Sequence, residues 1–329
     1  MTNQKETVQS SFLNEVRNRL PQSISFADEL SEVLSISRDS AYRRIRGETL
    51  LSLDEVKKLC DHFRLSLDQA LSPSSEMVTF QVRSLNSGNF SFEKWLHSIY
   101  DNLQMISQFA EKELIYHAKD LPIFHYFQYP LLSAFKMYFW FQTFAQNTSG
   151  TQEKFHAGVI PQELLSLGNR IWDKYAAIPS TEILSQEALT ATLRNIEFTL
   201  DCGLFQDRKD AVRLCDDCQR LLERLSYQAE NARKGPDATS AKFDIYHNEI
   251  LIGDNTILFK MGEKRVTFVT ANNFDLLATS HPFFCHQTEQ HIQNVIRRST
   301  LLSLNAQKER AKFFNRVSGH VEETRAHVS

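Results

Sequence analysis

The segment SISRDSAYRRIRGET, residues 35–49, concentrates side chains that could bind nucleic acid. A guanidinium group can donate two parallel hydrogen bonds to the edge of guanine, and it can equally bind phosphate oxygens. The pattern therefore predicts either a reader of nucleic acid or a solvated helix surface that is positively charged. The arginines of this segment are Arg38, Arg43, Arg44 and Arg46.

Two predicted helices and a tight turn would position these arginines. Residues 26–34, FADELSEVL, have the apolar spacing of an amphipathic helix, residues 35–37 form a turn, and residues 38–46 form a second helix. Ser37 stands at the N-cap of the second helix, and Gly47 stands where that helix should stop. This order matches a helix-turn-helix, whose second helix enters the major groove.

Positions along the second helix suggest a role for each side chain. Ser37, Arg38, Asp39 and Ser40 are polar residues at its start, where they can approach base edges. Tyr42 can reach a phosphate or a thymine methyl group, and the later arginines point around the helix toward phosphates. The predicted DNA-binding residues are Ser37, Arg38, Asp39, Ser40, Tyr42, Arg43, Arg44 and Arg46.

The residues around this pair of helices also predict short helices. Ser52 is followed three residues later by Glu55, which is the pattern of a capping box at the start of SLDEVKKLCDHF. With a helix before residue 20 and a short turn of helix in LSLDQAL, residues 1–71 are expected to form a five-helix domain.

In these features residues 8–71 resemble the Cro/C1-type (XRE-like) helix-turn-helix family. The resemblance is strongest in SISRDSAYRRIRGE and in SLDEVKKLCDHFRLSLDQAL. Two departures are visible: Ser35 occupies the turn position where the family usually has glycine, and the second helix is about one residue short. The resemblance implies a transcription regulator that binds double-stranded DNA.

The net charge of residues 1–71 affects how tightly such a domain would bind DNA. The whole chain has a formal net charge of -3, and residues 1–71 hold ten Lys and Arg against eleven Asp and Glu. Neutralisation of phosphates supplies most non-specific affinity, so a single near-neutral domain would bind weakly. We therefore expect a homodimer on a palindromic operator, and the residues after 89 are the expected dimerisation surface.

The rest of the chain predicts a linker at 72–89, in which Val78, Phe80 and Val82 alternate as in a short strand, and a helical body at 90–329. The body carries strand-like runs of Ile, Leu, Val and Thr, separated by turn residues, near residues 242–271. We predict a mainly α fold with a small antiparallel sheet there.

The most apolar helix, residues 130–145, is too short to span a membrane and contains Lys136. Five cysteines and a polar N-terminus predict a cytoplasmic protein without a disulfide framework.

Histidines and cysteines of the body could bind a metal or take part in catalysis. Cys215 and Cys218 have the spacing of half a zinc site, but they also lie on one apolar helix stripe. No phosphate loop, dinucleotide fingerprint or nucleophile elbow is present, so we predict no enzyme, no metal and no cofactor. An enzyme would require convergence of a scattered set of groups. They are His117, Asp120, His125, His281, Cys285 and His286, with His291 as a further metal ligand.

Aromatic residues crowd residues 124–144. They could form core alone, or they could also line an apolar pocket with a few polar groups. The candidate pocket residues are His117, His125, Phe127, Lys136 and Trp140. The body would then sense a small apolar ligand, as in long one-component regulators. The alternative is a protein-interaction scaffold whose helix-turn-helix serves as a tether and which binds no small molecule.

Overall fold

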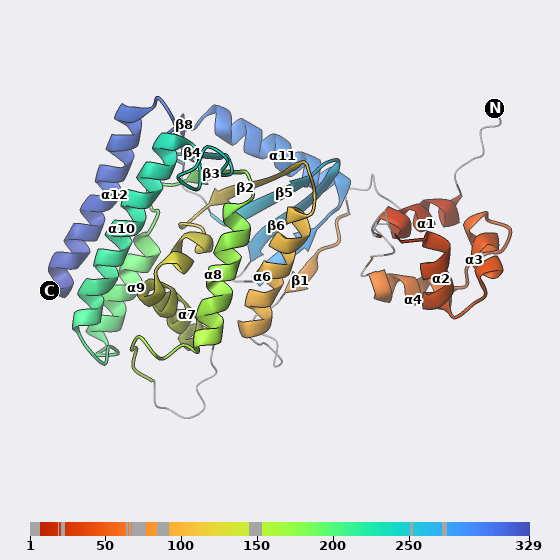
Figure 1. The fold of residues 1–329 in the computed structure, drawn as a ribbon, viewed down its shortest axis with the longest axis horizontal. Coiled ribbons are helices and arrows are strands. Elements are labelled where there is room, and N and C mark those ends of the chain that lie inside the picture. Colours follow the sequence, from red (N-terminus) through yellow and green to blue (C-terminus); the bar gives the residue numbers. More distant parts are fainter. Residues whose placement is uncertain are drawn as a thin grey trace. The chain divides into compact units, whose positions relative to one another are not determined.

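The chain divides into two compact units, which are described separately (Figure 1). In this computed structural model the described residues are 7–18, 20, 24–63, 65, 67, 77–83, 92–144, 153–250, 253–271 and 275–329. The N-terminal unit comprises Met1–Phe80 with His281–Phe284, and the C-terminal unit comprises Gln81–Ser280 with Cys285–Ser329.

Short helices around one small core build the N-terminal unit. The core holds Phe12, Val16, Leu30 and Leu59, and Ala41 of the second helix of the pair is buried with them. The fifth helix expected in LSLDQAL falls largely outside the described residues. The helices are α1 (Val8–Asn18), α2 (Phe26–Leu34), α3 (Arg38–Ile45) and α4 (Leu53–Phe63).

Local signals in the sequence set the limits of α3 and α4. The Ser37 hydroxyl accepts a hydrogen bond from the Ser40 amide at 3.2 Å, so it caps α3. Gly47 has a φ of 77°, and its amide and the next one donate to carbonyls of the last turn of α3, which is a Schellman motif. The Ser52 hydroxyl and the Glu55 carboxylate each accept from the other's amide, as expected of a capping box.

The C-terminal unit contains an eight-stranded mixed sheet, so the expectation of a mainly α fold with a small antiparallel sheet near residues 242–271 was wrong. The strand order is β1-β7-β6-β5-β2-β3-β4-β8, with β2, β3 and β4 parallel and the other pairs antiparallel. The strands are β1 (Gln81–Arg83), β2 (Lys112–Ala118), β3 (Ser180–Leu184), β4 (Phe243–His247), β5 (Thr256–Met261), β6 (Lys264–Ala271), β7 (Asp275–Thr279) and β8 (Thr300–Leu301).

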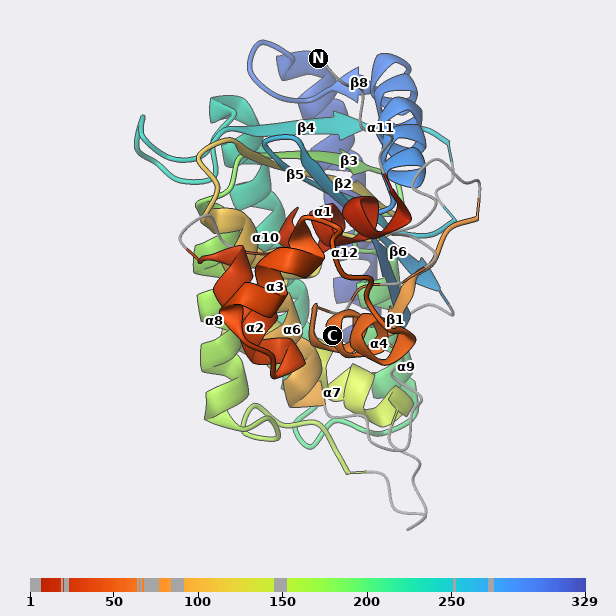
Figure 2. The same ribbon diagram turned by 90° about the vertical axis from the view of Figure 1, so that its right-hand side faces the viewer.

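Helices cover both faces of this sheet, which makes the unit an α/β structure. One face packs on a large core to which most of the helices contribute, and α11 lies on the other face (Figure 2). There Ile292 of α11 packs against Ile115 and Ile183. The helices are α6 (Phe92–Ser107), the 3-10 helix η1 (Ile123–Gln128), α7 (Pro130–Phe144), α8 (Gln162–Ala176), α9 (Thr190–Asp201), α10 (Lys209–Asn231), α11 (Pro282–Arg297) and α12 (Gln307–Val328). Among the described residues, none of the helices combines the length and apolarity that a membrane crossing would need.

Candidate functional site

Helix α3 turns most of its predicted DNA-binding residues toward solvent. Ala41 is buried and Ile45 is half-buried against the core of the N-terminal unit. The opposite side of the helix is exposed and polar, and Ser40 is half-buried beside the Ser37 cap. The exposed residues of this surface are Ser37, Arg38, Asp39, Tyr42, Arg43 and Arg46.

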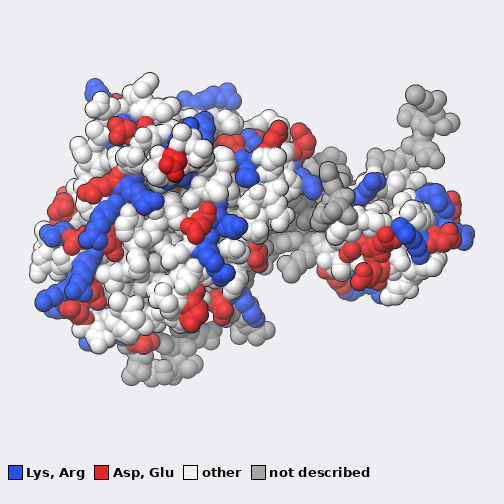
Figure 3. Space-filling model, viewed as in Figure 1, with Lys and Arg blue, Asp and Glu red and all other residues white. Residues whose placement is uncertain are grey.

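Acidic side chains of the same unit pair with the exposed arginines. Figure 3 shows acidic and basic side chains intermixed on the visible face of this unit. Arg38 Nε lies 2.8 Å from Asp28 Oδ1, and Arg46 Nε lies 2.7 Å from Glu48 Oε1. Arg43 Nε lies 3.9 Å from the other oxygen of Glu48. The hydrogen bond from Arg46 lowers the pKa of Glu48. Exposed pairs of this kind contribute little to stability.

Arg44 differs from the other three arginines because it is held inside the unit. Its Nη2 lies 2.7 Å from Glu55 Oε1, its Nε lies 3.3 Å from Glu55 Oε2, and its Nη1 donates to the Ser40 carbonyl at 3.2 Å. The Arg44 and Glu55 side chains are each only 16% exposed. Burial favours a higher pKa for Glu55, but the hydrogen bonds from Arg44 and the Ser52 amide outweigh it and lower the pKa. This geometry ties α3 to α4.

The second candidate site is a cavity of about 380 Å³ in the C-terminal unit. It lies on the large-core face of the sheet, beside the carboxyl end of β2, which is a common place for a ligand in α/β folds. Its walls come from α6, β2, η1, α7, α9, β5, β6 and β7, and they are mostly apolar and aromatic. The aromatic residues of the wall are Phe92, Trp95, Tyr116, Phe124, Tyr126, Phe139, Trp140, Phe259 and Phe268.

Two of the five predicted pocket residues, Lys136 and Trp140, line this cavity. Phe127 is instead part of the core, where Gly168 of α8 approaches it so closely that a β-carbon would lie 2.8 Å from its ring. The side chain of His117 points away from the cavity, to the opposite face of the sheet. Its ring centroid lies 6.3 Å from that of His291 on α11. Burial, together with the charge of His291, lowers the pKa of His117 to about 4.

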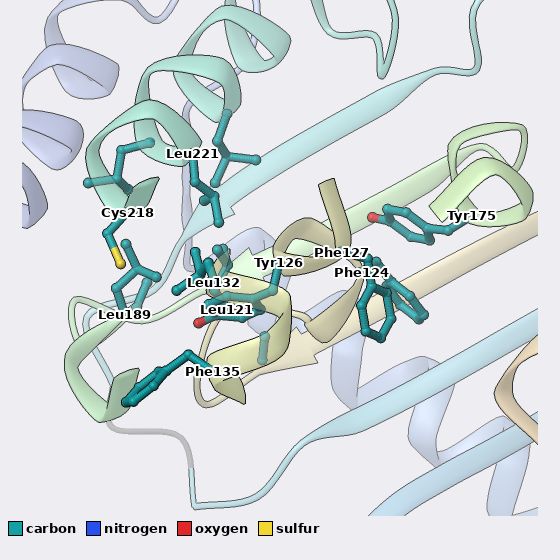
Figure 4. Packing of buried hydrophobic residues seen from close by; sticks show 14 of the residues in the cluster. Leu121, Phe124, Tyr126, Phe127, Leu132, Phe135, Tyr175, Leu189, Cys218 and Leu221 are labelled. Carbon is teal, nitrogen blue, oxygen red and sulfur yellow. The ribbon is translucent and has the colours of Figure 1, made fainter. Parts of the chain in front are cut away.

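His125 belongs to a buried polar cluster behind the cavity wall. Its Nε2 lies 2.9 Å from Glu182 Oε1, and the Tyr175 hydroxyl donates to the same oxygen. Lys234 Nζ donates to the Tyr175 carbonyl at 2.7 Å and to Ser180 Oγ at 2.6 Å. Phe124, which lines the cavity, stacks on Tyr175 of the cluster with ring centroids 4.3 Å apart (Figure 4).

Burial dominates the titration of this cluster. It lowers the pKa of Lys234 well below its usual value, against the opposing charge of Glu182. It also raises the pKa of Tyr175, and the charge of Glu182 adds to that effect. Sequence reasoning missed Glu182 and Lys234. The available signal was a glutamate directly before the apolar pair Ile183 and Leu184, where an unpaired charge would be costly if the segment were buried.

The remaining candidate groups lie apart from one another. Asp120 lines the cavity, whereas the thiol of Cys285 lies 3.4 Å from the Thr267 hydroxyl. Cys215 and Cys218 are buried on α10, where burial raises the pKa of Cys215 to about 12, and Figure 4 shows the Cys218 sulfur beside Leu189 inside the core. Across the described parts of the chain, no three His, Cys, Asp or Glu side chains are grouped closely enough to hold a metal ion.

Comparison with known proteins adds no family to this description. No family model matches the sequence, and neither a curated protein nor a solved structure matches it.

Proposed function

We propose that this protein is a sequence-specific DNA-binding transcription regulator, in which α3 reads the major groove and the C-terminal unit dimerises and binds a signal molecule. The exposed polar face of α3 carries the proposal: Arg38, Asp39, Tyr42, Arg43 and Arg46 share it, and Ala41 anchors the opposite side. The capped start and tight preceding turn of α3 also suit a recognition helix.

The pairing of the arginines refines the predicted roles. Arg38 stands at the start of α3 and remains the candidate for a base edge, while Arg43 and Arg46 are the candidates for phosphates. Arg44 is committed to Glu55, so its expected role is to hold α3 in position. Two copies of this near-neutral unit on a palindromic operator would supply the affinity that one copy lacks.

The test measures binding of the full-length protein to duplexes selected from a random pool, as a function of salt. Arg43→Ala should weaken binding to all sequences and flatten the dependence of log affinity on log salt by about one unit. Arg38→Ala should cost about 1–3 kcal/mol at one base position only. Arg213→Ala is the matched control, because Arg213 is similarly exposed and is paired with Asp210.

One observation favours a second candidate function, a protein-interaction scaffold. Each of the four arginines of the α3 segment is paired with a carboxylate of the same unit, which leaves a nearly neutral surface. A stoichiometric protein partner recovered from cells, combined with no DNA binding at low salt, would establish this function in place of the first.

A further inference from the structure

The polar end of the cavity contains a carboxylate in a fixed position. Asp120 Oδ1 accepts hydrogen bonds from the Leu121 amide at 2.9 Å and from the Leu189 amide at 3.0 Å. Leu189 has a φ of 72° and precedes α9, so its amide is held by the start of that helix. The two amides hold Oδ1, and Oδ2 lies 3.6 Å from Lys136 Nζ.

Lys136 is equally fixed, although it carries a charge and is only 6% exposed. Its Nζ donates to Thr192 Oγ1 at 3.0 Å, and the Tyr126 hydroxyl lies 2.9 Å from the same oxygen. The ammonium group also lies 4.6 Å from the centre of the Tyr126 ring and 5.6 Å from that of Trp140. Among the described residues Thr192 is its hydrogen-bond partner and Asp120 its ion-pair partner, so N–H donor capacity remains for a ligand.

The opposite charges of Lys136 and Asp120 determine which polar group of a ligand fits the polar end of the cavity. A carboxylate that approached Lys136 would also approach Asp120 and be repelled, and an ammonium group that approached Asp120 would be repelled by Lys136. A group that both accepts and donates a hydrogen bond satisfies both side chains without adding a charge. The third charged side chain of the wall, Lys119, is exposed.

The rest of the cavity wall suits a bound molecule whose main part is apolar and which carries a few further uncharged polar atoms. Trp95 and Trp140 meet edge to face at 5.4 Å, and Phe92 packs 5.3 Å from Trp95. The side-chain amides of Asn102 and Asn195 line the cavity and have no hydrogen-bond partner among the residues that the structure describes. Flat apolar groups pack well on such aromatic walls.

We infer that the cavity binds an uncharged, flat apolar molecule whose hydroxyl or primary amide group accepts a hydrogen bond from Lys136 and donates one to Asp120. The inference rests on the proposed function only in that this molecule would be the signal of the regulator. The binding itself involves the C-terminal unit alone.

Three probes of one shape test the choice of head group: 4-phenylphenol, biphenyl-4-carboxylate and 4-phenylbenzylammonium. Calorimetric titration of the full-length protein, free of DNA, should show the phenol binding about tenfold or more tighter than either ion, because each ion leaves a buried charge uncompensated. Equal affinities for the three probes, or no binding by any of them, would overturn the inference.

Charge substitutions in the pair should reverse this order. In Lys136→Met the ammonium probe becomes the tightest ligand, because it replaces the lost positive charge beside Asp120. In Asp120→Asn the carboxylate probe becomes the tightest. Lys242→Met is the matched control, because Lys242 pairs with Asp244 away from the cavity wall, and it should keep the wild-type order.

The outcomes separate this inference from the proposed function. The wild-type order of the three probes decides the ligand class even if a variant fails to fold, which near-ultraviolet circular dichroism would reveal. If the order and its reversals hold but the phenol leaves DNA affinity unchanged, the ligand class stands and the sensing role fails. If DNA binding is absent while the order holds, only the regulator proposal fails.

Discussion

At the scale of single residues, arginines that look alike in the sequence have different surroundings. Arg43 and Arg44 are neighbours on α3, yet Arg43 is 56% exposed and Arg44 is 16% exposed. The difference follows from the helical period, which turns Arg44 toward Glu55 on α4 and Arg43 toward solvent. A run of basic residues therefore mixes surface charges with a structural ion pair.

Replacing Arg44 by alanine should destabilise the N-terminal unit by about 1–3 kcal/mol, because Glu55 would keep its largely buried charge with only the Ser52 amide to stabilise it. Arg43→Ala should change stability by less than about 0.5 kcal/mol. Hydrogen exchange of the α3 and α4 amides in the full-length protein measures both effects. Equal protection in the two variants would contradict the structural role of Arg44.

His117 should make stability depend on pH. Its pKa is about 4 in the fold and about 6.5 when unfolded, so the unfolded chain binds the proton more readily. The stability that His117 contributes is complete above pH 6.5 and is lost as the pH falls toward 4. His117→Gln should reduce the shift in urea midpoint between about pH 7 and pH 4.5. The exposed His327→Gln should leave that shift unchanged.

His117 also shows why the cavity could be predicted only in part. Residues 112–118 were not expected to form a strand, so His117 and His125 were assigned to one pocket with Lys136. In β2 successive side chains point to opposite faces, which sends His117 toward α11 and leaves Tyr116 on the cavity side. Lys136 and Trp140, chosen from the aromatic-rich stretch, lie four residues apart on α7 and therefore face the same cavity.

At the scale of elements, local signals were readable and distant pairings were not. Ser37, Gly47 and Ser52 act within one turn of their helices, so the caps of α3 and α4 were predicted correctly. Strands β2 and β3 lie in the middle of the sheet and pair across the helices that separate them in the chain. Their segments lack both the alternation of a half-exposed strand and the turn of a hairpin.

The turn between α2 and α3 offers a test of backbone strain. Ser35 has a φ of 55° and a ψ of 46°, a left-handed conformation that favours glycine. Ser35→Gly should therefore stabilise the N-terminal unit by about 0.5 kcal/mol, after the entropy of the unfolded glycine is subtracted. Ser37→Ala should instead cost about 1 kcal/mol, because it removes the cap of α3. Urea denaturation measures both; a destabilised Ser35→Gly protein would contradict the strain.

At the scale of the whole molecule, the segment expected to be a linker contributes to the sheet. The sequence suggested a linker at residues 72–89 with room for a short strand, and residues 81–83 form β1, with Val82 opposite Leu277 of β7. Three residues within a Ser- and Gly-rich segment carry too little pattern to reveal a partner so far along the chain. The division into compact units accordingly falls after Phe80.

Two truncations would test where the C-terminal unit begins. A chain that starts at Met77 should keep β1, whereas a chain that starts at Phe90 should lose it and leave the outer edge of β7 unpaired. The shorter chain should be less stable to urea by about 1–3 kcal/mol and should scatter more light, because an open strand edge promotes association. Identical stability and solubility would show that β1 contributes nothing.

The pairing of β1 with β7 also bears on how the protein is made. Gln81 pairs with Ala278, so a strand at the start of its unit must wait until β7 has been synthesised. The N-terminal unit has a core drawn largely from residues 12–65 and can fold on the ribosome long before that point. During the interval β1 has no partner strand, and its short length of three residues limits the risk of pairing with a neighbouring nascent chain.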